Sequence, residues 1–202
     1  MATVPDEEIL KIKSLYEAGL HMLQISKEIG YPLNAVVYAM RHHNITRRDR
    51  RAAAANRFAQ KEPSFKIPKK LTPHQTKLKL LGTALYWAEG YKTEKSKGID
   101  FANSDSSMVL LFLQFLREVC HIDETRIKVL LYSHDEELSG GQCSYWSALL
   151  NIPLNNFSKP YIAKTDKTLD KKRKMKYGLV HLRYMDKKLL FQVLEWIEEL
   201  KN

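Results

Sequence analysis

The stretch LLGTALYWAEG, from Leu80 to Gly90, constrains the fold more than any other part of the chain, because its apolar residues recur at the spacing of one long helix. Thr72 followed by Pro73 predicts where that helix begins. The Thr side chain can accept a hydrogen bond from a free backbone N–H of the first turn. Proline at the first helical position costs no hydrogen bond, because the N–H that it lacks would have no partner within the helix. Gly90 predicts its end, in the left-handed conformation that glycine adopts at little cost. We therefore expect a helix over residues 73–89.

One face of this predicted helix carries very small side chains. Ala84 and Ala88 lie one turn apart on it, so a second backbone could approach closely there. Glu89 would be the last helical residue, at the end where the helix dipole disfavours negative charge. Two interpretations follow. Either an amphipathic core helix happens to carry an acid in its last turn, or the helix presents this carboxylate for a function.

Residues 82–90, GTALYWAEG, resemble the LAGLIDADG motif of homing endonucleases, with small residues at the third and seventh places and an acid and a glycine at the end. In that family two motif helices pack across a two-fold axis, and their terminal acids hold divalent metal ions over the scissile phosphates. The resemblance implies that Glu89 is the catalytic, metal-binding residue and Mg2+ the cofactor. The chain departs from the motif at Gly82, Trp87 and Glu89, where the family has leucine, an inner acid and usually Asp.

The chain contains one such motif, so the resemblance implies a homodimer, since a self-complementary two-fold helix pair needs only one sequence. The expected dimer interface is one side of the motif helix, formed by Leu81, Ala84, Leu85 and Ala88.

Residues 6–45 contain three short helical patterns, separated by Gly19 and by Gly30-Tyr31-Pro32. A short helix, a turn containing glycine and a second helix form a helix-turn-helix unit. The segment resembles the helix-turn-helix of resolvases and many bacterial regulators. The matching positions are Glu17, Ala18, Gly19, Ile25, Glu28, Ile29, Gly30, Val36, Arg41, His43, Ile45 and Arg48.

The predicted core of this unit consists of Ile25, Ile29, Val36 and Met40. The outer face of the third helix would then carry side chains that can reach base edges in the major groove. These are Leu33, Asn34, Val37, Tyr38 and Arg41. A three-helix protein-interaction module is the alternative, and the basic run that follows argues against it. That run contains Arg47, Arg48, Arg50 and Arg51, which we also expect to contact DNA.

Charge and proline spacing give the domain organisation. A net charge of +10 indicates a polyanionic partner. Pro63, Pro68 and Pro73 keep the chain extended, so we expect a linker over residues 50–72 between a helix-turn-helix domain, 1–49, and a second domain, 73–202. This linker either lies along DNA phosphates or is a solvated, flexible tether, and both descriptions can hold together.

Other classes of protein are disfavoured. No apolar run reaches the length of a membrane span, and the N-terminus MATVPDEE lacks the features of a signal peptide. Two cysteines without CxxC spacing give no disulfide framework. We expect a cytoplasmic, nucleoid-associated protein with no membrane partner.

After Gly90 the pattern alternates between strands and helices. We expect a hairpin of strands 91–94 and 98–103, strands near 126–133, 161–164 and 177–184, and helices near 108–120, 144–152 and 189–200. Asp100, His181 and Arg183 are predicted on outward positions of these strands. The order resembles the α+β, αββαββα LAGLIDADG fold with a curved antiparallel sheet, plus an added helix near 139–152.

In that fold the outer strands lie in the DNA major groove. The resemblance therefore implies DNA contacts by the outward side chains of Lys92, Lys97, Lys128, Tyr132 and Arg183. A basic loop would add phosphate contacts through Lys171, Lys172, Arg173 and Lys174, although such a loop is more often simply solvated.

These patterns favour a sequence-specific, double-stranded DNA-binding protein, LAGLIDADG-like with a fused helix-turn-helix, acting as a regulator or a degenerate homing endonuclease. Trp87 in place of the inner acid favours binding over cleavage. Glu89 supports the alternative, an active Mg2+-dependent, site-specific endonuclease that works as a homodimer.

Overall fold

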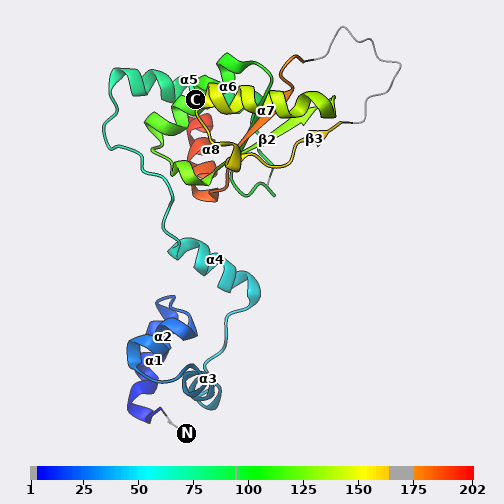
Figure 1. The fold of residues 1–202 in the computed structure, drawn as a ribbon. Coiled ribbons are helices and arrows are strands. Elements are labelled where there is room, and N and C mark those ends of the chain that lie inside the picture. Colours follow the sequence, from blue (N-terminus) through cyan, green and yellow to red (C-terminus); the bar gives the residue numbers. More distant parts are fainter. Residues whose placement is uncertain (1–3, 94, 164–174) are drawn as a thin grey trace. The chain divides into compact units, whose positions relative to one another are not determined.

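A computed structural model of the chain describes residues 4–93, 95–163 and 175–202. The chain is α+β and divides into two compact units, Met1–Glu62 and Pro63–Asn202, each with its own core (Figure 1). No helix in the described ranges combines the length and the apolar character needed to cross a membrane.

The N-terminal unit is helical. A 3-10 turn, Asp6–Glu8, leads into α1 (Ile9–Glu17), and α2 (Met22–Ile29), α3 (Leu33–His42) and α4 (Arg50–Gln60) follow. Its core contains Ile12, Tyr16, Ile25, Val36, Ala39 and Met40. The prediction of Ile25, Val36 and Met40 as core residues is confirmed, and Ile29 packs against them while partly buried.

Helix α4 lies where the sequence analysis placed an extended linker. Asp49 caps its first turn by accepting a hydrogen bond from the Ala52 backbone N–H at 2.7 Å. Four consecutive alanines follow, and alanine has the highest helix propensity of all residues. The prolines that suggested an extended chain come later, so they do not interrupt the helix.

The predicted boundary between linker and second domain, at residue 72, also differs from the structure. The second unit begins at Pro63, because Phe65, Ile67 and Leu71 pack against its core. The backbone N–H and the hydroxyl of Ser64 donate to Asp186 at 2.9 and 2.6 Å. Residues 63–72 are therefore a fixed part of this unit.

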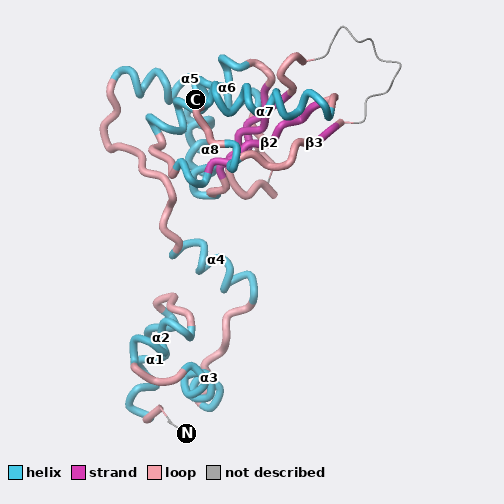
Figure 2. The backbone as a smooth tube through the Cα atoms, in the orientation of Figure 1, coloured by secondary structure: helices cyan, strands magenta, loops and turns pink. Residues whose placement is uncertain are grey.

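The C-terminal unit combines helices with a four-stranded sheet (Figure 2). Its helices are α5 (Pro73–Glu89), α6 (Ser106–Gln114), which continues as a π-helical turn, Phe115–Val119, then α7 (Glu136–Leu150) and α8 (Lys187–Lys201). Two 3-10 turns are Glu124–Arg126 and Leu154–Asn156. The strands are β1 (Ile99–Asn103), β2 (Ile127–Ser133), β3 (Tyr161–Ile162) and β4 (Leu179–Tyr184).

The sheet has the order β1-β4-β2-β3, in which β4 runs antiparallel to both of its neighbours. The alternate residues of each strand that face the helices are fully buried. They include Ile99, Phe101, Ile127, Val129, Leu131, Val180, Leu182 and Tyr184. Asp100, His181 and Arg183 alternate with these residues along β1 and β4, as the outward positions predicted for them require.

Three expectations about the strands and helices of this unit are wrong. Residues 91–93 form no strand, and a bridge between Gly90 and Phe101 joins this segment to β1. The sheet is mixed instead of antiparallel, since β3 pairs parallel to β2. The helix after β2 starts earlier than predicted, at Glu136, because Asp135 caps it.

Helix α5 begins as predicted, with Thr72 as N-cap in a capping box with Gln75 and Pro73 in the first turn. Its predicted end is wrong in one respect. Gly90 is extended, with φ −79° and ψ 149°, and not left-handed. Glycine is required for another reason, because a Cβ here would come closer than 3.0 Å to the Tyr86 ring and carbonyl.

The closest packing of α5 within the unit occurs at Gly82. A Cβ on this residue would lie closer than 3.0 Å to Cβ, Cγ and Cδ1 of Phe115, so the helix backbone rests directly on the Phe115 side chain. Leu78, Thr83 and Tyr86 are buried on the same side of the helix. Gly82 therefore allows the helix to lie against Phe115 without a side chain between them.

Gly82→Ala should lower the free energy of unfolding of the C-terminal unit by about 1 to 3 kcal/mol, because the added methyl group overpacks the contact with Phe115. All three tryptophans, Trp87, Trp146 and Trp196, lie in this unit, so their fluorescence in urea reports its unfolding. Gly140→Ala is the matched control. It lies in α7 with open space around its Cα and should gain up to about 1 kcal/mol. Equal effects of the two substitutions would contradict the close contact.

Candidate nucleic-acid interface

Helix α3 presents one exposed face in the N-terminal unit. Its start is fixed by α2, which ends at Gly30 with φ 75°, and by Tyr31-Pro32, which turns the chain. Val36, Ala39 and Met40 point into the core. The opposite face exposes Leu33, Asn34, Tyr38 and Arg41, while Val37 is half-buried. Four of the five predicted base-contacting residues are therefore accessible on one side of one helix.

Tyr38 extends this face toward the end of the helix. Its ring stacks on His42 with 5.8 Å between centroids and 8° between planes, and 60% of its surface is exposed. A flat, accessible aromatic pair of this kind can pack against a base edge or a sugar. Asn34 and Arg41 lie two turns apart, and both can form paired hydrogen bonds with purines.

Arg48, predicted to contact DNA, is engaged within the protein. Its guanidinium carbon lies 4.0 Å from the centre of the Tyr16 ring, and its Nη1 donates to the Leu20 carbonyl at 3.2 Å. Its backbone N–H donates to the Tyr16 hydroxyl at 2.8 Å. Arg48 thus holds the chain after α3 against the core, whereas Arg47, Arg50 and Arg51 are exposed.

In the C-terminal unit, the outer face of the sheet carries a polar cluster on β1 and β4. Asp100 accepts hydrogen bonds from His181 Nδ1 and Arg183 Nε, both at 2.8 Å. Asp100 and Arg183 are direct neighbours in the strand register. Arg183, another predicted DNA contact, is therefore half-buried and paired with an acid of its own chain.

His181 lies on the outward side of β4, as predicted, but only 2% of its surface is exposed. The rings of Tyr91 and Tyr132 cover it, with centroids 5.6 and 4.6 Å away. Its Nε2 has no hydrogen-bond partner within the described part of the chain. His181 is therefore buried by the aromatic rings that cover it, although it lies on the outward side of the sheet.

The remaining predicted contacts of this unit divide into three groups. Lys97 and Lys128 are exposed, and Tyr132 is half-buried with its ring 4.8 Å from that of Tyr161. Lys92 is exposed, but its Nζ donates to the carbonyls of Tyr86, Trp87 and Gly90 at 2.6 to 3.3 Å. The loop residues Lys171, Lys172, Arg173 and Lys174 lie outside the described residues.

Glu89 is exposed at the end of α5, beside the carbonyls that Lys92 caps. Burial raises the pKa of the neighbouring Tyr86 to about 12, so this hydroxyl stays neutral and donates to the Tyr91 carbonyl at 2.8 Å. Among the residues that the structure describes, no three His, Cys, Asp or Glu side chains come together at a spacing that could hold a metal ion. Within the described part of one chain, Glu89 is therefore a single carboxylate and not part of a metal-binding group.

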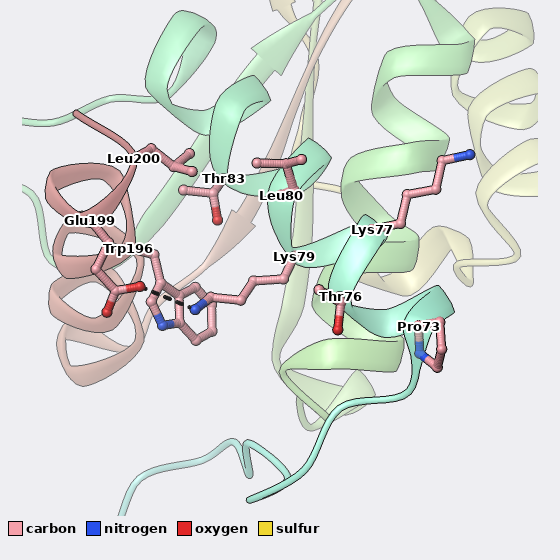
Figure 3. Close-up of a pocket in the computed structure, with 9 residues that line it drawn as sticks. All are labelled: Pro73, Thr76, Lys77, Lys79, Leu80, Thr83, Trp196, Glu199 and Leu200. Atoms are coloured by element: carbon pink, nitrogen blue, oxygen red, sulfur yellow. Dashed lines mark hydrogen bonds and ion pairs between the residues drawn. The ribbon is translucent and has the colours of Figure 1, made fainter. Parts of the chain in front are cut away.

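A groove of about 470 Å³ runs between α5 and α8 (Figure 3). Lys79 reaches across it to Glu199 at 3.3 Å and lies 4.6 Å from the centre of the Trp196 ring. Leu80 and Leu200 line it as exposed apolar side chains. Although Lys77 also lines this groove, Lys79 is paired with Glu199 and the walls are mainly apolar, so the groove is poorly suited to phosphate.

The predicted dimer-interface residues of α5 differ in exposure. Ala84 and Ala88 are exposed, Leu81 is half-buried, and Leu85 is half-buried and packs against the unit's core. Leu80 and Trp87 add 52% and 45% exposed apolar surface toward α8, where Leu80 lines the groove and the Trp87 ring lies 5.7 Å from Lys201 Nζ. The described part of one chain thus leaves Ala84 and Ala88 accessible.

Sequence reasoning missed the role of Asp100 and the aromatic cover of His181. Alternation alone places Asp100 and Arg183 on the outer face, but their pairing needs the register between β1 and β4, which are 75 residues or more apart in the chain. No local pattern carries that information. The signal would have been an acid and a base on facing positions of neighbouring strands.

Comparisons with protein-family models, curated proteins and solved structures find no significant match to this chain.

Asp100→Ala should destabilise the C-terminal unit by about 1 to 3 kcal/mol, because it leaves the buried His181 and the half-buried Arg183 without their acceptor. Tryptophan fluorescence in urea measures the change. Asp100→Asn keeps one acceptor oxygen and should lose less. An Asp100→Ala variant as stable as the wild type would show that the cluster contributes nothing to folding.

Proposed function

We propose that the chain is a sequence-specific, double-stranded DNA-binding protein, and that it acts as a regulator or a degenerate homing endonuclease. The observation that carries this proposal is the exposed face of α3, where Asn34, Tyr38 and Arg41 stand opposite the unit's core. Side chains of these types, on the second helix of a helix-turn-helix, have the chemistry and the spacing to read bases in the major groove.

A protein-interaction module is less well supported for this unit. Exposed Tyr and Arg side chains also suit a protein interface, but the exposed cations that follow this face, Arg47, Arg50 and Arg51, favour a polyanion. A chain of net charge +10 attracts a polyanion before any specific contact forms.

The second proposed contact is the outer face of the sheet, in a LAGLIDADG-like arrangement. The succession of α5, β1, α6, β2, β4 and α8 and the bridge between Gly90 and Phe101 support that arrangement. Lys97, Lys128, Tyr132 and Tyr161 would face the DNA, with the loop lysines 171, 172 and 174 and Arg173 adding contacts to phosphates. Arg183 and Lys92 then act mainly through their own chain.

A homodimer through α5 completes the proposal. The predicted interface of Leu81, Ala84, Leu85 and Ala88 is apolar and, at the exposed alanines, small enough for a second copy of the same helix to approach closely. Exposed Leu80 and Trp87 add apolar surface toward α8. We place the protein in the cytoplasm, bound to the nucleoid.

The alternative is a Mg2+-dependent endonuclease, and the position of Glu89 at the exposed end of α5 favours it. Mg2+ prefers oxygen ligands and keeps several waters, so two carboxylates from two chains could hold it at a two-fold axis. The metal would activate water and stabilise the leaving oxygen of a phosphodiester. Glu89 would bind it, and α5 would position that carboxylate.

Arg41→Ala and Asn34→Ala should each weaken binding to the preferred duplex by about 1 to 3 kcal/mol and relax base preference at one position. Fluorescence anisotropy with preferred and scrambled duplexes measures both effects. Arg47→Ala is the control for a phosphate contact and should weaken binding to both duplexes alike. If neither Asn34→Ala nor Arg41→Ala changes binding, α3 does not read DNA.

Ala84→Leu should shift the protein from dimer toward monomer in sedimentation, because the larger side chain separates two crossing helices and costs roughly 1 to 3 kcal/mol. Ala148→Leu places the same change on an exposed position of α7 and should leave the dimer intact. A wild type that is monomeric at every concentration would exclude this helix pair.

Glu89→Gln should preserve or tighten the dimer, since two like charges near an axis repel each other. If the endonuclease alternative is right, the same substitution abolishes Mg2+-dependent nicking of the preferred duplex. If wild type and Glu89→Gln both leave that duplex intact, the protein is a DNA-binding regulator.

A further inference from the structure

Helix α4 carries an exposed basic side with no acid in it. Arg50, Ala54 and Arg57 follow one another at the four- and three-residue steps of a helix face, with Arg51 one position further round. All four are exposed. Residues 50–60, RRAAAANRFAQ, contain no Asp or Glu, so this charge is not neutralised within the helix.

The position of these cations works against the helix itself. Arg50 and Arg51 occupy its first turn, where the helix dipole is positive and a cation is unfavourable. No residue of α4 is fully buried, and Phe58 is partly buried. Alanine propensity and the Asp49 cap stabilise it, and the arginines gain nothing there from local structure.

The helix is nevertheless anchored to the N-terminal unit. The side-chain amides of Asn56 and Gln60 both donate to the carbonyl of Gly19, the latter at 2.7 Å. Gly19 lies in the turn between α1 and α2 with φ 104°, a conformation that other residues rarely adopt. Arg48, stacked on Tyr16, fixes the chain just before the helix.

The anchor leaves the basic side of α4 accessible. Asn56 and Gln60 lie about a quarter turn away from the side of Arg50 and Arg57, so anchoring leaves the basic side accessible. A helix that served only as a solvated tether would need no such anchor. Arg50 and Arg57 are about 10 Å apart along the axis, a length over which one DNA strand carries about three phosphates.

We propose that this side of α4, formed by Arg50, Ala54 and Arg57 with Arg51 beside them, is a second DNA-binding surface of the N-terminal unit that contacts backbone phosphates only. It rests on the proposed DNA-binding function and extends it. The unit reads bases through α3 and holds the duplex through α4, which the Gly19 carbonyl keeps in a fixed orientation. Phosphate contact alone adds affinity equally for all sequences.

The test uses the full chain and the double variant Arg50→Gln/Arg57→Gln in fluorescence anisotropy with a preferred and a scrambled duplex. Loss of two phosphate contacts should lower the slope of log K against log salt concentration by about 1.8, at roughly 0.9 per contact, for both duplexes. Lys11→Gln/Lys13→Gln removes the same charge from exposed positions of α1 and should leave the slope unchanged.

Asn56→Ala/Gln60→Ala tests the anchor while keeping every arginine. It should weaken binding to both duplexes, because α4 must then be ordered at the moment of binding. If this variant binds as tightly as the wild type, α4 does not need to be held in a fixed orientation to contact DNA.

The outcomes separate this inference from the proposed function. If the wild type binds DNA and Arg50→Gln/Arg57→Gln leaves its salt slope unchanged, α4 is a solvated helix and only this inference fails. If both control and test variants lower the slope equally, the effect is one of net charge and the surface is again excluded. If the wild type binds no duplex, the proposed function itself fails.

Discussion

The C-terminal unit depends on one close contact, that of the Gly82 backbone with the Phe115 side chain. Because α5 lies directly on the π-helical turn after α6, Tyr86 enters the core and stacks on Phe112, which in turn stacks on Phe101 of β1. The same seating turns Ala84 and Glu89 outward. Packing inside the unit at Gly82 therefore determines which side of α5 remains accessible.

Several cations of this basic chain stabilise its own structure. Arg48 stacks on Tyr16, Lys92 caps the carbonyls that end α5, and Arg183 pairs with Asp100. The donors of these cations are already engaged within the protein, and the charge of Arg183 is also balanced by Asp100, so they are less available to phosphate. Fewer cations are therefore available to a polyanion than net charge suggests, and these include exposed side chains such as Arg41 in the N-terminal unit and Lys128 in the C-terminal unit.

Much of the fold follows from local patterns in the sequence. Capping residues such as Thr72 and Asp186, and the alternation of β2 and β4, predict elements because their causes lie within a few residues. Features set by distant contacts could not be predicted. Gly90 is extended because Tyr86 fills the space beside it, and His181 is buried because aromatic rings from other segments cover it. For the candidate site, helical periodicity gave the exposed face of α3, whereas the engagement of individual cations required the three-dimensional structure.

The central claim is that this chain recognises double-stranded DNA by sequence. Selection of binding sites by the full-length protein from a pool of random duplexes tests it most directly, at a salt concentration near 150 mM, where non-specific attraction is weakened. The account predicts enrichment of one motif, with a two-fold related arrangement of half-sites if the chain binds as a homodimer. A pool that remains random after repeated rounds, or retention of single-stranded competitors in preference to duplexes, would contradict it.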